Sequence, residues 1–177
     1  MKNLFKGAAL AAVMFLGTQY VSAQQKVGHI NADEVFQATP EFKAAEEQLK
    51  TLQESKGKEY QGMVEEYQKK LAEAQEKART RSEANKATVD VELEAMGQEL
   101  QNIEQRIQEN QRIAQEEVGK KQQDLLAPIQ QKVMNAINAV AKEKGYAYIL
   151  DVSNGSVIYF DGGEDVSADV KAKLGIK

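Results

Sequence analysis

The sequence predicts an α+β fold that is predominantly helical, in which a small β-sheet body from both chain ends carries a long antiparallel coiled-coil helical hairpin. Three observations favour this fold. Of the 177 residues, 6% are aromatic and 28% are charged, which leaves little apolar mass for a thick single core. Residues 41–127 contain no Pro and are rich in good helix formers. Segments of strand-forming residues lie on both sides of that stretch.

Residues 1–23 have the pattern of a secretory signal peptide. Lys2 and Lys6 form a basic start, residues 7–17 are apolar, and Ala23 ends a run of small residues typical of a cleavage site. The apolar run is too short to span a bilayer as an ordinary transmembrane helix. A helix that anchors the chain in the membrane is the alternative. We therefore expect cleavage after Ala23 and export of the remaining chain.

The mature chain is expected to open with part of the sheet body, residues 24–40. Val27–Ile30 combines β-branched and apolar residues and predicts a short strand. The helical arm should begin directly after this segment.

Residues 41–127 are expected to form that arm. Apolar or small side chains recur there at spacings of three and four, which predicts the narrow seam of a coiled coil. In the first half these residues are Phe42, Ala45, Leu49, Leu52, Tyr60, Met63, Tyr67, Leu71, Ala74 and Ala78. In the second half they are Leu93, Met96, Leu100, Ile103, Ile107, Ala114, Val118 and Leu125. The polar residues that interrupt the seam are Lys56, Asn110 and Lys121.

The two halves of the seam favour a hairpin over one straight rod of roughly 130 Å, the length that 1.5 Å per residue would give. Pairs such as Tyr67 with Ile103, and Leu52 with Val118, have residue numbers that add to one constant value. Antiparallel packing requires such a constant. It places the tip of the arm near residues 81–88.

The end of the long helix is marked by Pro128, which should close or kink it because proline lacks a backbone donor and clashes with the preceding turn. Helical spacing resumes at Ile129. It should stop at Gly145, where a glycine suits a left-handed cap.

Two further strands are expected after this helix. Tyr146–Leu150 and Val157–Phe160 are rich in strand formers, and Asn154–Gly155 between them predicts a tight β-hairpin. Ser167 should cap a last short helix. Residues 128–177 would therefore complete the sheet body.

A sheet of about three short strands buries little apolar surface by itself. We therefore expect the body to associate with other copies of the chain, in a closed homo-oligomer that covers the strand edges. The residues expected to form this oligomerisation body are Val27, Ile30, Tyr146, Tyr148, Ile149, Val157, Tyr159 and Phe160.

Short motifs at the two ends of the mature chain resemble the Skp/OmpH family of periplasmic chaperones. In the opening block they are Val27–Asn31, Glu34–Gln37 and Lys43–Leu49. In the closing block they are Leu126–Ile129, Val140–Tyr146, Ile149–Asp151 and Asp165–Ser167. The resemblance implies a homotrimer in which strands of three chains form a shared central β-barrel. It also implies that three helical arms enclose a cavity for unfolded outer-membrane proteins crossing the periplasm, with no catalytic residue or cofactor.

The leading hypothesis is therefore an ATP-independent holdase that prevents unfolded outer-membrane proteins from aggregating. No phosphate-binding loop is present to support ATP-driven release. The alternative is a structural coiled-coil protein that spaces or tethers envelope components. Candidate client-contacting residues on the arm are Tyr60, Met63, Tyr67, Val89, Val91 and Met96. All except Val89 and Val91 also fit the seam, and we expect those two valines to be exposed.

Composition and charge argue against several other functions. The chain has no Cys, and His29 is its one histidine, so thiol catalysis and paired-histidine metal sites are not expected. An excess of acidic over basic residues, 27 against 23, disfavours nucleic-acid binding. The basic stretch 69–86 could contact anionic lipid or lipopolysaccharide. It precedes an acidic stretch, residues 90–117, so ordinary ion pairs on helix surfaces are the alternative.

Overall fold

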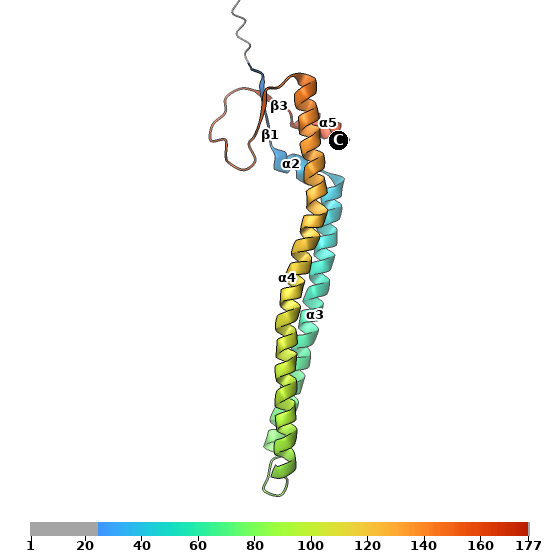
Figure 1. Cartoon of the computed structure of the whole chain (residues 1–177), viewed down its shortest axis with the longest axis vertical. Helices are drawn as coiled ribbons and strands as arrows, with labels where there is room; N and C mark the ends of the chain where they lie inside the picture. Colours follow the sequence, from blue (N-terminus) through green and yellow to red (C-terminus); the bar gives the residue numbers. More distant parts are fainter. Residues whose placement is uncertain (1–24, 177) are drawn as a thin grey trace, which may run out of the picture.

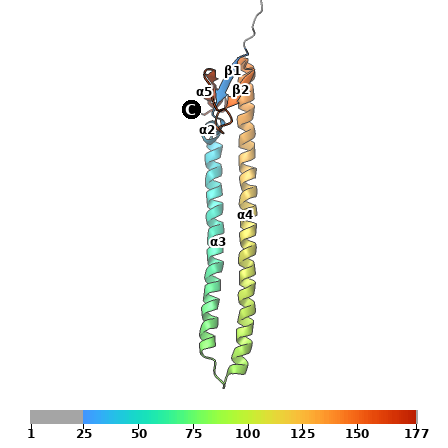
Figure 2. The same cartoon turned by 90° about the vertical axis from the view of Figure 1, so that its left-hand side faces the viewer.

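The computed structural model describes residues 25–176, so the predicted signal peptide lies outside the described residues. It shows a long pair of antiparallel helices, the arm, that projects from a small platform of strands and helices (Figures 1 and 2). In chain order the elements are β1 (Val27–Ile30), α2 (Ala32–Gln37), α3 (Pro40–Arg79), α4 (Lys86–Lys144), β2 (Tyr148–Asp151), β3 (Glu164–Asp165) and α5 (Ser167–Lys173). The predominantly helical fold with a small sheet is therefore confirmed.

The arm begins at a capped helix start in the platform. Thr39 is fully buried, and its hydroxyl accepts the N–H of Phe42 at 3.2 Å. Pro40 occupies the first turn of α3, where its missing donor costs nothing and its fixed φ suits a helix. These two residues set the point where α3 leaves the platform.

The chain reverses between α3 and α4 over a short turn held by one asparagine. The Asn85 side chain accepts the N–H of Ser82 at 2.7 Å and donates to the carbonyl of Thr80 at 2.9 Å. An asparagine can thus support this turn without Gly or Pro. The helices run back along each other, so the straight-rod alternative is wrong.

Ion pairs report the register between the two helices. Near the tip Lys70 pairs with Glu99, one residue from the position that the constant residue sum predicts. Nearer the platform Lys56 pairs with Glu117, displaced by almost one helical turn from the predicted position. The predicted register is therefore close at the tip and shifted at the base.

Helix α4 continues through Pro128 and ends at Gly145, which has φ 70°. Of the two outcomes expected at Pro128, closure of the helix is wrong. Pro128 is exposed, while Ile129 and Val133 are buried and hold the helix in place.

The sheet has three parallel strands in the order β2-β1-β3. The hairpin predicted around Asn154–Gly155 does not form, and Val157–Phe160 is not a strand. The reason lies at Asp151, whose carboxylate accepts the N–H groups of Ala32 at 3.2 Å and Ser153 at 3.0 Å. These bonds turn the chain off the sheet edge before it reaches Asn154, so β2 pairs with β1 instead.

The core of the molecule lies between one face of this sheet and the end of α4. Its buried residues are Ile30, Val35, Val133, Ala136, Val140, Tyr146, Val166 and Val170. Between residues 25 and 176, no helix combines the length and the apolar character that crossing a membrane requires.

Candidate binding surfaces

The arm has a packed seam that contains most of the predicted client-contacting residues. Ala45 and Ile103 are each 2% exposed, and Met63, Tyr67 and Met96 are half-buried between the helices. The seam interpretation therefore holds for these last three side chains. Their remaining exposed surface lies along the edges of the seam.

The two valines near the tip, Val89 and Val91, differ in solvent exposure. Val89 is 7% exposed, so the expectation that it faces solvent is wrong, whereas Val91 is 67% exposed. Side chains two positions apart on a helix point about 200° apart. Val89 therefore packs inward at the start of α4 and Val91 points away from the helix pair.

A row of apolar side chains on α3 follows one edge of the seam and shares Tyr67 with it. Tyr60, Val64, Tyr67 and Leu71 recur at spacings of four, three and four and so lie on one side of the helix; we call them the arm stripe. Tyr60 is 38% and Leu71 36% exposed, and Val64 and Tyr67 are half-buried. The expected seam includes Tyr60 and Leu71 but not Val64. The spacing of Val64, four residues after Tyr60 and three before Tyr67, is the signal that identifies it.

Oppositely charged side chains join the two helices of the arm. Lys70 and Glu99 are 2.9 Å apart, Lys77 contacts Glu92, and Arg106 lies 3.7 Å from Glu66. The glutamate partner holds the pKa of Lys70 above its ordinary value, chiefly through their hydrogen bond. Lys70 and Lys77 of the basic stretch thus pair with Glu99 and Glu92 of the acidic stretch on the other helix, and not with residues three or four positions away on their own helix.

The basic residues at the tip are also paired. Arg81 forms two hydrogen bonds with Asp90, including Nη2 to Oδ2 at 2.8 Å, and these bonds lower the pKa of Asp90. Lys86 pairs with Glu83 at 2.7 Å. A tip whose cations already have carboxylate partners attracts anionic lipid less than the sequence alone suggests.

Polar residues interrupt the seam in its middle section, as the sequence indicates. The Lys56 side chain is only 19% exposed and bonds to Glu117 at 2.8 Å and Glu59 at 3.3 Å. The Oδ1 atom of Asn110 is buried in the seam and forms no hydrogen bond with the described residues. This section is held by less apolar contact than the tip and base.

The sheet presents a second apolar surface on the face that α4 does not cover. Side chains alternate along a strand, so Ile30 and Ile149 enter the core, while Val27, Tyr148 and Leu150 point to the other face. Tyr148 is 56% exposed, Val27 38% and Leu150 37%. We call this surface the open sheet face.

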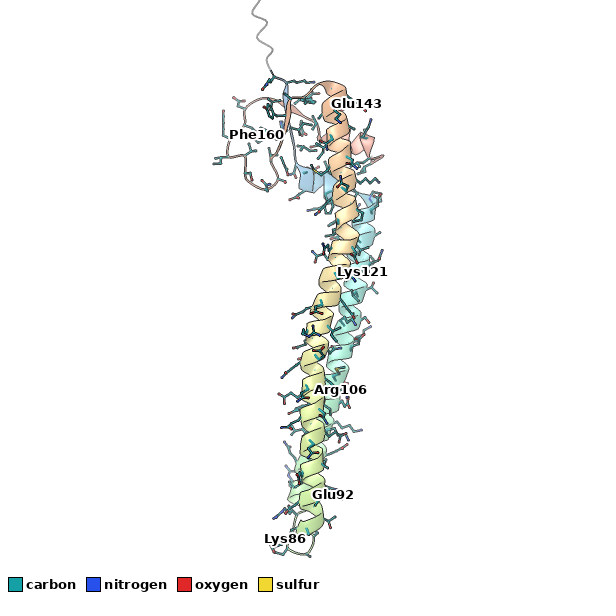
Figure 3. All side chains as sticks on the ribbon, in the orientation of Figure 1. Lys86, Glu92, Arg106, Lys121, Glu143 and Phe160 are labelled. Atoms are coloured by element: carbon teal, nitrogen blue, oxygen red, sulfur yellow. The ribbon has the colours of Figure 1, made fainter. Side chains whose placement is uncertain are left out.

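The loop of residues 152–163 extends this apolar surface. Ile158 is 97% and Tyr159 79% exposed, and the Phe160 ring lies 4.7 Å from the His29 ring. Figure 3 places Phe160 on this loop, beside the sheet and far from the arm residues Lys86 and Glu92. Of the predicted body residues, Val157, Tyr159 and Phe160 are thus brought together, although not as a strand.

Tyr146, another predicted body residue, belongs to the core instead. It is 8% exposed, its hydroxyl hydrogen-bonds to Glu164, and Lys26 Nζ lies 4.1 Å from the centre of its ring. Burial is the main reason that the pKa of Tyr146 lies above its ordinary value. The hydrogen bond also ties the end of α4 to β3.

His29 lies on the central strand, on the same face as Leu150, and packs against Phe160. In residues 25–176 no three His, Asp or Glu side chains gather in a way that could hold a metal ion. The surfaces described above therefore offer apolar and charged contacts.

The fold and sequence are similar to those of a known protein family. A family model described as outer membrane protein (OmpH-like) matches residues 26–174. The chain belongs to the OmpH-like family. This confirms the family resemblance that the motifs at the two ends of the mature chain indicate.

One solved structure similar to this OmpH-like chain is that of a protein described as an outer membrane chaperone (OmpH-like) from Caulobacter crescentus CB15. The two share 20% sequence identity with a TM-score of 0.68, and the alignment covers 86% of this chain and 85% of the other. At that identity the similarity establishes the fold. No curated protein sequence matches the chain. Membership of the family suggests a chaperone role in the periplasm.

Proposed function

We propose that this OmpH-like chain is an ATP-independent holdase of the periplasm that binds unfolded outer-membrane β-barrel proteins and prevents their aggregation. The observation that carries the proposal is the arm stripe, with Tyr60 and Leu71 exposed beside an already packed seam. The described Caulobacter crescentus CB15 protein and the predicted signal peptide support the same role and the same compartment.

Holding an unfolded client requires many contacts that are individually weak. An exposed tyrosine or leucine gains roughly 25 cal/mol for each square ångström of apolar surface it buries against a client. Several arms acting together raise the effective concentration of the next contact without making any one contact hard to break. Such binding needs no ATP, and release follows when the client finds a more stable state.

The proposed active form is a homotrimer joined through the open sheet face and residues 157–160 of the adjoining loop, a contact that leaves Asn154 and Gly155 outside it. Tyr148 on the open sheet face and Ile158 and Tyr159 in the adjoining loop are exposed apolar residues. Contiguous apolar surface of this kind is typical of protein–protein contacts, and a closed ring of strands would cover the exposed sheet edges. In a trimer three arms would project from one side of this shared base and enclose the client.

A light-scattering assay tests the proposal. A denatured outer-membrane β-barrel protein is diluted into buffer with and without a several-fold molar excess of the purified protein. We expect suppressed scattering with the unmodified protein. Combined Tyr60→Ser and Leu71→Ser substitutions should weaken the suppression, because they remove apolar surface from the arm stripe.

The matched control changes exposed polar residues of the same helix, Gln53→Ser and Gln68→Ser, and should leave suppression intact. If the unmodified protein fails to suppress scattering, the holdase proposal is wrong. A spacer or tether would then explain an arm that is closed along its length by ion pairs such as Lys70–Glu99.

A further inference from the structure

The Asn154–Gly155 pair lies in the loop between β2 and β3 without the strand pairing that its sequence predicts. Both residues are exposed. The Oδ1 atom of Asn154 accepts the N–H of Ser156 at 2.9 Å. Gly155 has φ 69°, and no atom beyond its two chain neighbours lies within 4 Å of the position that a side chain would occupy. The pair is therefore accessible to solvent.

We propose that Asn154 is a site of spontaneous deamidation, with water as the reactant. The backbone nitrogen of Gly155 attacks the side-chain carbon Cγ of Asn154 and loses its proton to solvent. The side-chain nitrogen takes up a proton and leaves as ammonia, which closes a five-membered succinimide ring. Water then adds to one of the two ring carbonyls and opens the ring to aspartate or isoaspartate. No oxidant, reductant or cofactor takes part.

The local geometry favours each part of this reaction. Among the described residues, no acceptor binds the N–H of Gly155, so its loss breaks no internal hydrogen bond. Glycine has no side chain to hinder the approach of its nitrogen. The hydrogen bond from Ser156 to Oδ1 draws electron density from Cγ and makes that carbon a better electrophile.

Among residues 25–176, the other exposed asparagines lack these features. Asn102, Asn135 and Asn138 lie within α4, where the N–H of the following residue belongs to the helical hydrogen-bond ladder. Asn31 is half-buried, and the N–H of the following Ala32 bonds to Asp151. We therefore expect Asn154 to react faster than Asn102 by more than an order of magnitude.

The product places a carboxylate close to the apolar residues of the loop. Asn154 precedes Val157 by three positions, and Ile158 and Tyr159 follow. The modified chain has one more negative charge, so it should separate from the unmodified chain by ion exchange.

Peptide mapping tests the proposal on the intact purified protein. The protein is kept in mildly alkaline buffer, sampled over days, digested and analysed by mass spectrometry. The peptide that contains Asn154 should gain the mass difference between an amide and an acid and appear as two isomers. Hydroxylamine should cleave the chain after Asn154 by trapping the succinimide.

One variant, an internal control residue and an unfolded sample complete the experiment. Asn154→Gln should suppress the reaction, because closure of the larger six-membered ring is slow, and Asn102 serves as the internal control in every sample. In urea the rate at Asn154 should match the folded rate within a few-fold, since the fold leaves this loop open. Equal rates at Asn154 and Asn102 in the folded protein, or protection of Asn154 by an order of magnitude relative to urea, would overturn the proposal.

Discussion

Phe160 and His29 lie ring against ring, with centroids 4.7 Å apart and planes tilted by 44°. This contact brings the loop that follows β2 back onto the side of the sheet that α4 leaves uncovered. Ile158 and Tyr159 of the same loop remain exposed. The apolar surface of the platform therefore continues from the sheet into the loop.

A charge on the open sheet face should prevent assembly. Tyr148 is 56% exposed in the single chain, so Tyr148→Glu should leave the fold intact. In the proposed interface the same carboxylate would be buried without a partner, which is strongly unfavourable. Light scattering coupled to size exclusion should report a monomer for Tyr148→Glu and the proposed trimer for the unmodified protein.

The control adds the same charge to the arm by Gln98→Glu, at an exposed position of α4. It should remain trimeric. A Tyr148→Glu protein that also remains trimeric would show that assembly uses another surface.

Core packing in the platform should dominate its stability. Ile30 is 1% exposed, so Ile30→Ala removes buried surface and leaves a cavity, which we expect to lower the free energy of unfolding by about 2–5 kcal/mol. Met134 is 51% exposed, and Met134→Ala should change the free energy of unfolding by about 0.5 kcal/mol or less. Urea denaturation followed by circular dichroism compares the two. Similar losses for both would contradict the assignment of Ile30 to the core.

The arm could be predicted from sequence because its structure is local and periodic. A spacing of three and four over a long Pro-free stretch determines which side of each helix is buried, as at Ala45 and Ile103. The constant residue sum of the seam predicts the antiparallel direction. The ion pairs differ from the predicted register by one residue at Lys70–Glu99 and by three at Lys56–Glu117, because the seam spacing does not fix the alignment of the helices to a single residue.

The platform could not be predicted in the same detail because its pairing depends on contacts between distant residues. Asn154–Gly155 favours a hairpin locally, but the hydrogen bond that the N–H of Ala32 donates to Asp151, 119 residues away, turns the chain first. Val89 was misplaced for a related reason. Its burial depends on where α4 begins after the turn, which the periodicity of the seam does not fix. Which apolar residues of the arm stripe and of the loop stay exposed depends on how the rest of the chain packs, and that packing cannot be predicted from local sequence.

Val89 and Val91 offer a matched pair that separates stability from client binding. Val89→Ser should lower the thermal stability of the arm, because it places a hydroxyl at a buried position. Val91→Ser should leave stability unchanged, because this side chain is 67% exposed. It should reduce the suppression of client aggregation modestly, since one of several apolar contacts is lost. If Val91→Ser destabilises the arm as much as Val89→Ser, the two orientations are wrong.

Acid should destabilise the platform through Asp165. Hydrogen bonds from Ser167 hold the pKa of Asp165 below its ordinary value. A folded-state pKa below the unfolded one stabilises the fold at pH above the ordinary Asp value of about 3.9, and this stabilisation is lost as the pH falls through the folded pKa. Asp165→Asn should therefore be less stable than the unmodified protein at neutral pH.

The difference between these two proteins should shrink as the pH falls and vanish below the folded pKa of Asp165. Urea denaturation at a series of pH values measures it. A difference that stays constant over the whole range would mean that ionisation of Asp165 contributes nothing.

Asn110 should lower the stability of the arm and, at the same time, favour one register of its two helices. Its Oδ1 atom is buried in the seam, where a polar side chain costs stability and disfavours alternative alignments of the helices. Asn110→Leu should raise the free energy of unfolding of the arm by about 1 kcal/mol or more. It should also loosen the register, because the leucine matches its neighbours at every seven-residue shift.

Spin labels on α3 and α4 measure this loosening. The distributions of distances between them should broaden in Asn110→Leu, whereas Gln108→Leu at an exposed position should leave the distributions narrow. A more stable arm whose distance distributions remain as narrow as before would show that the ion pairs between the helices, such as Lys70–Glu99, set the register without Asn110.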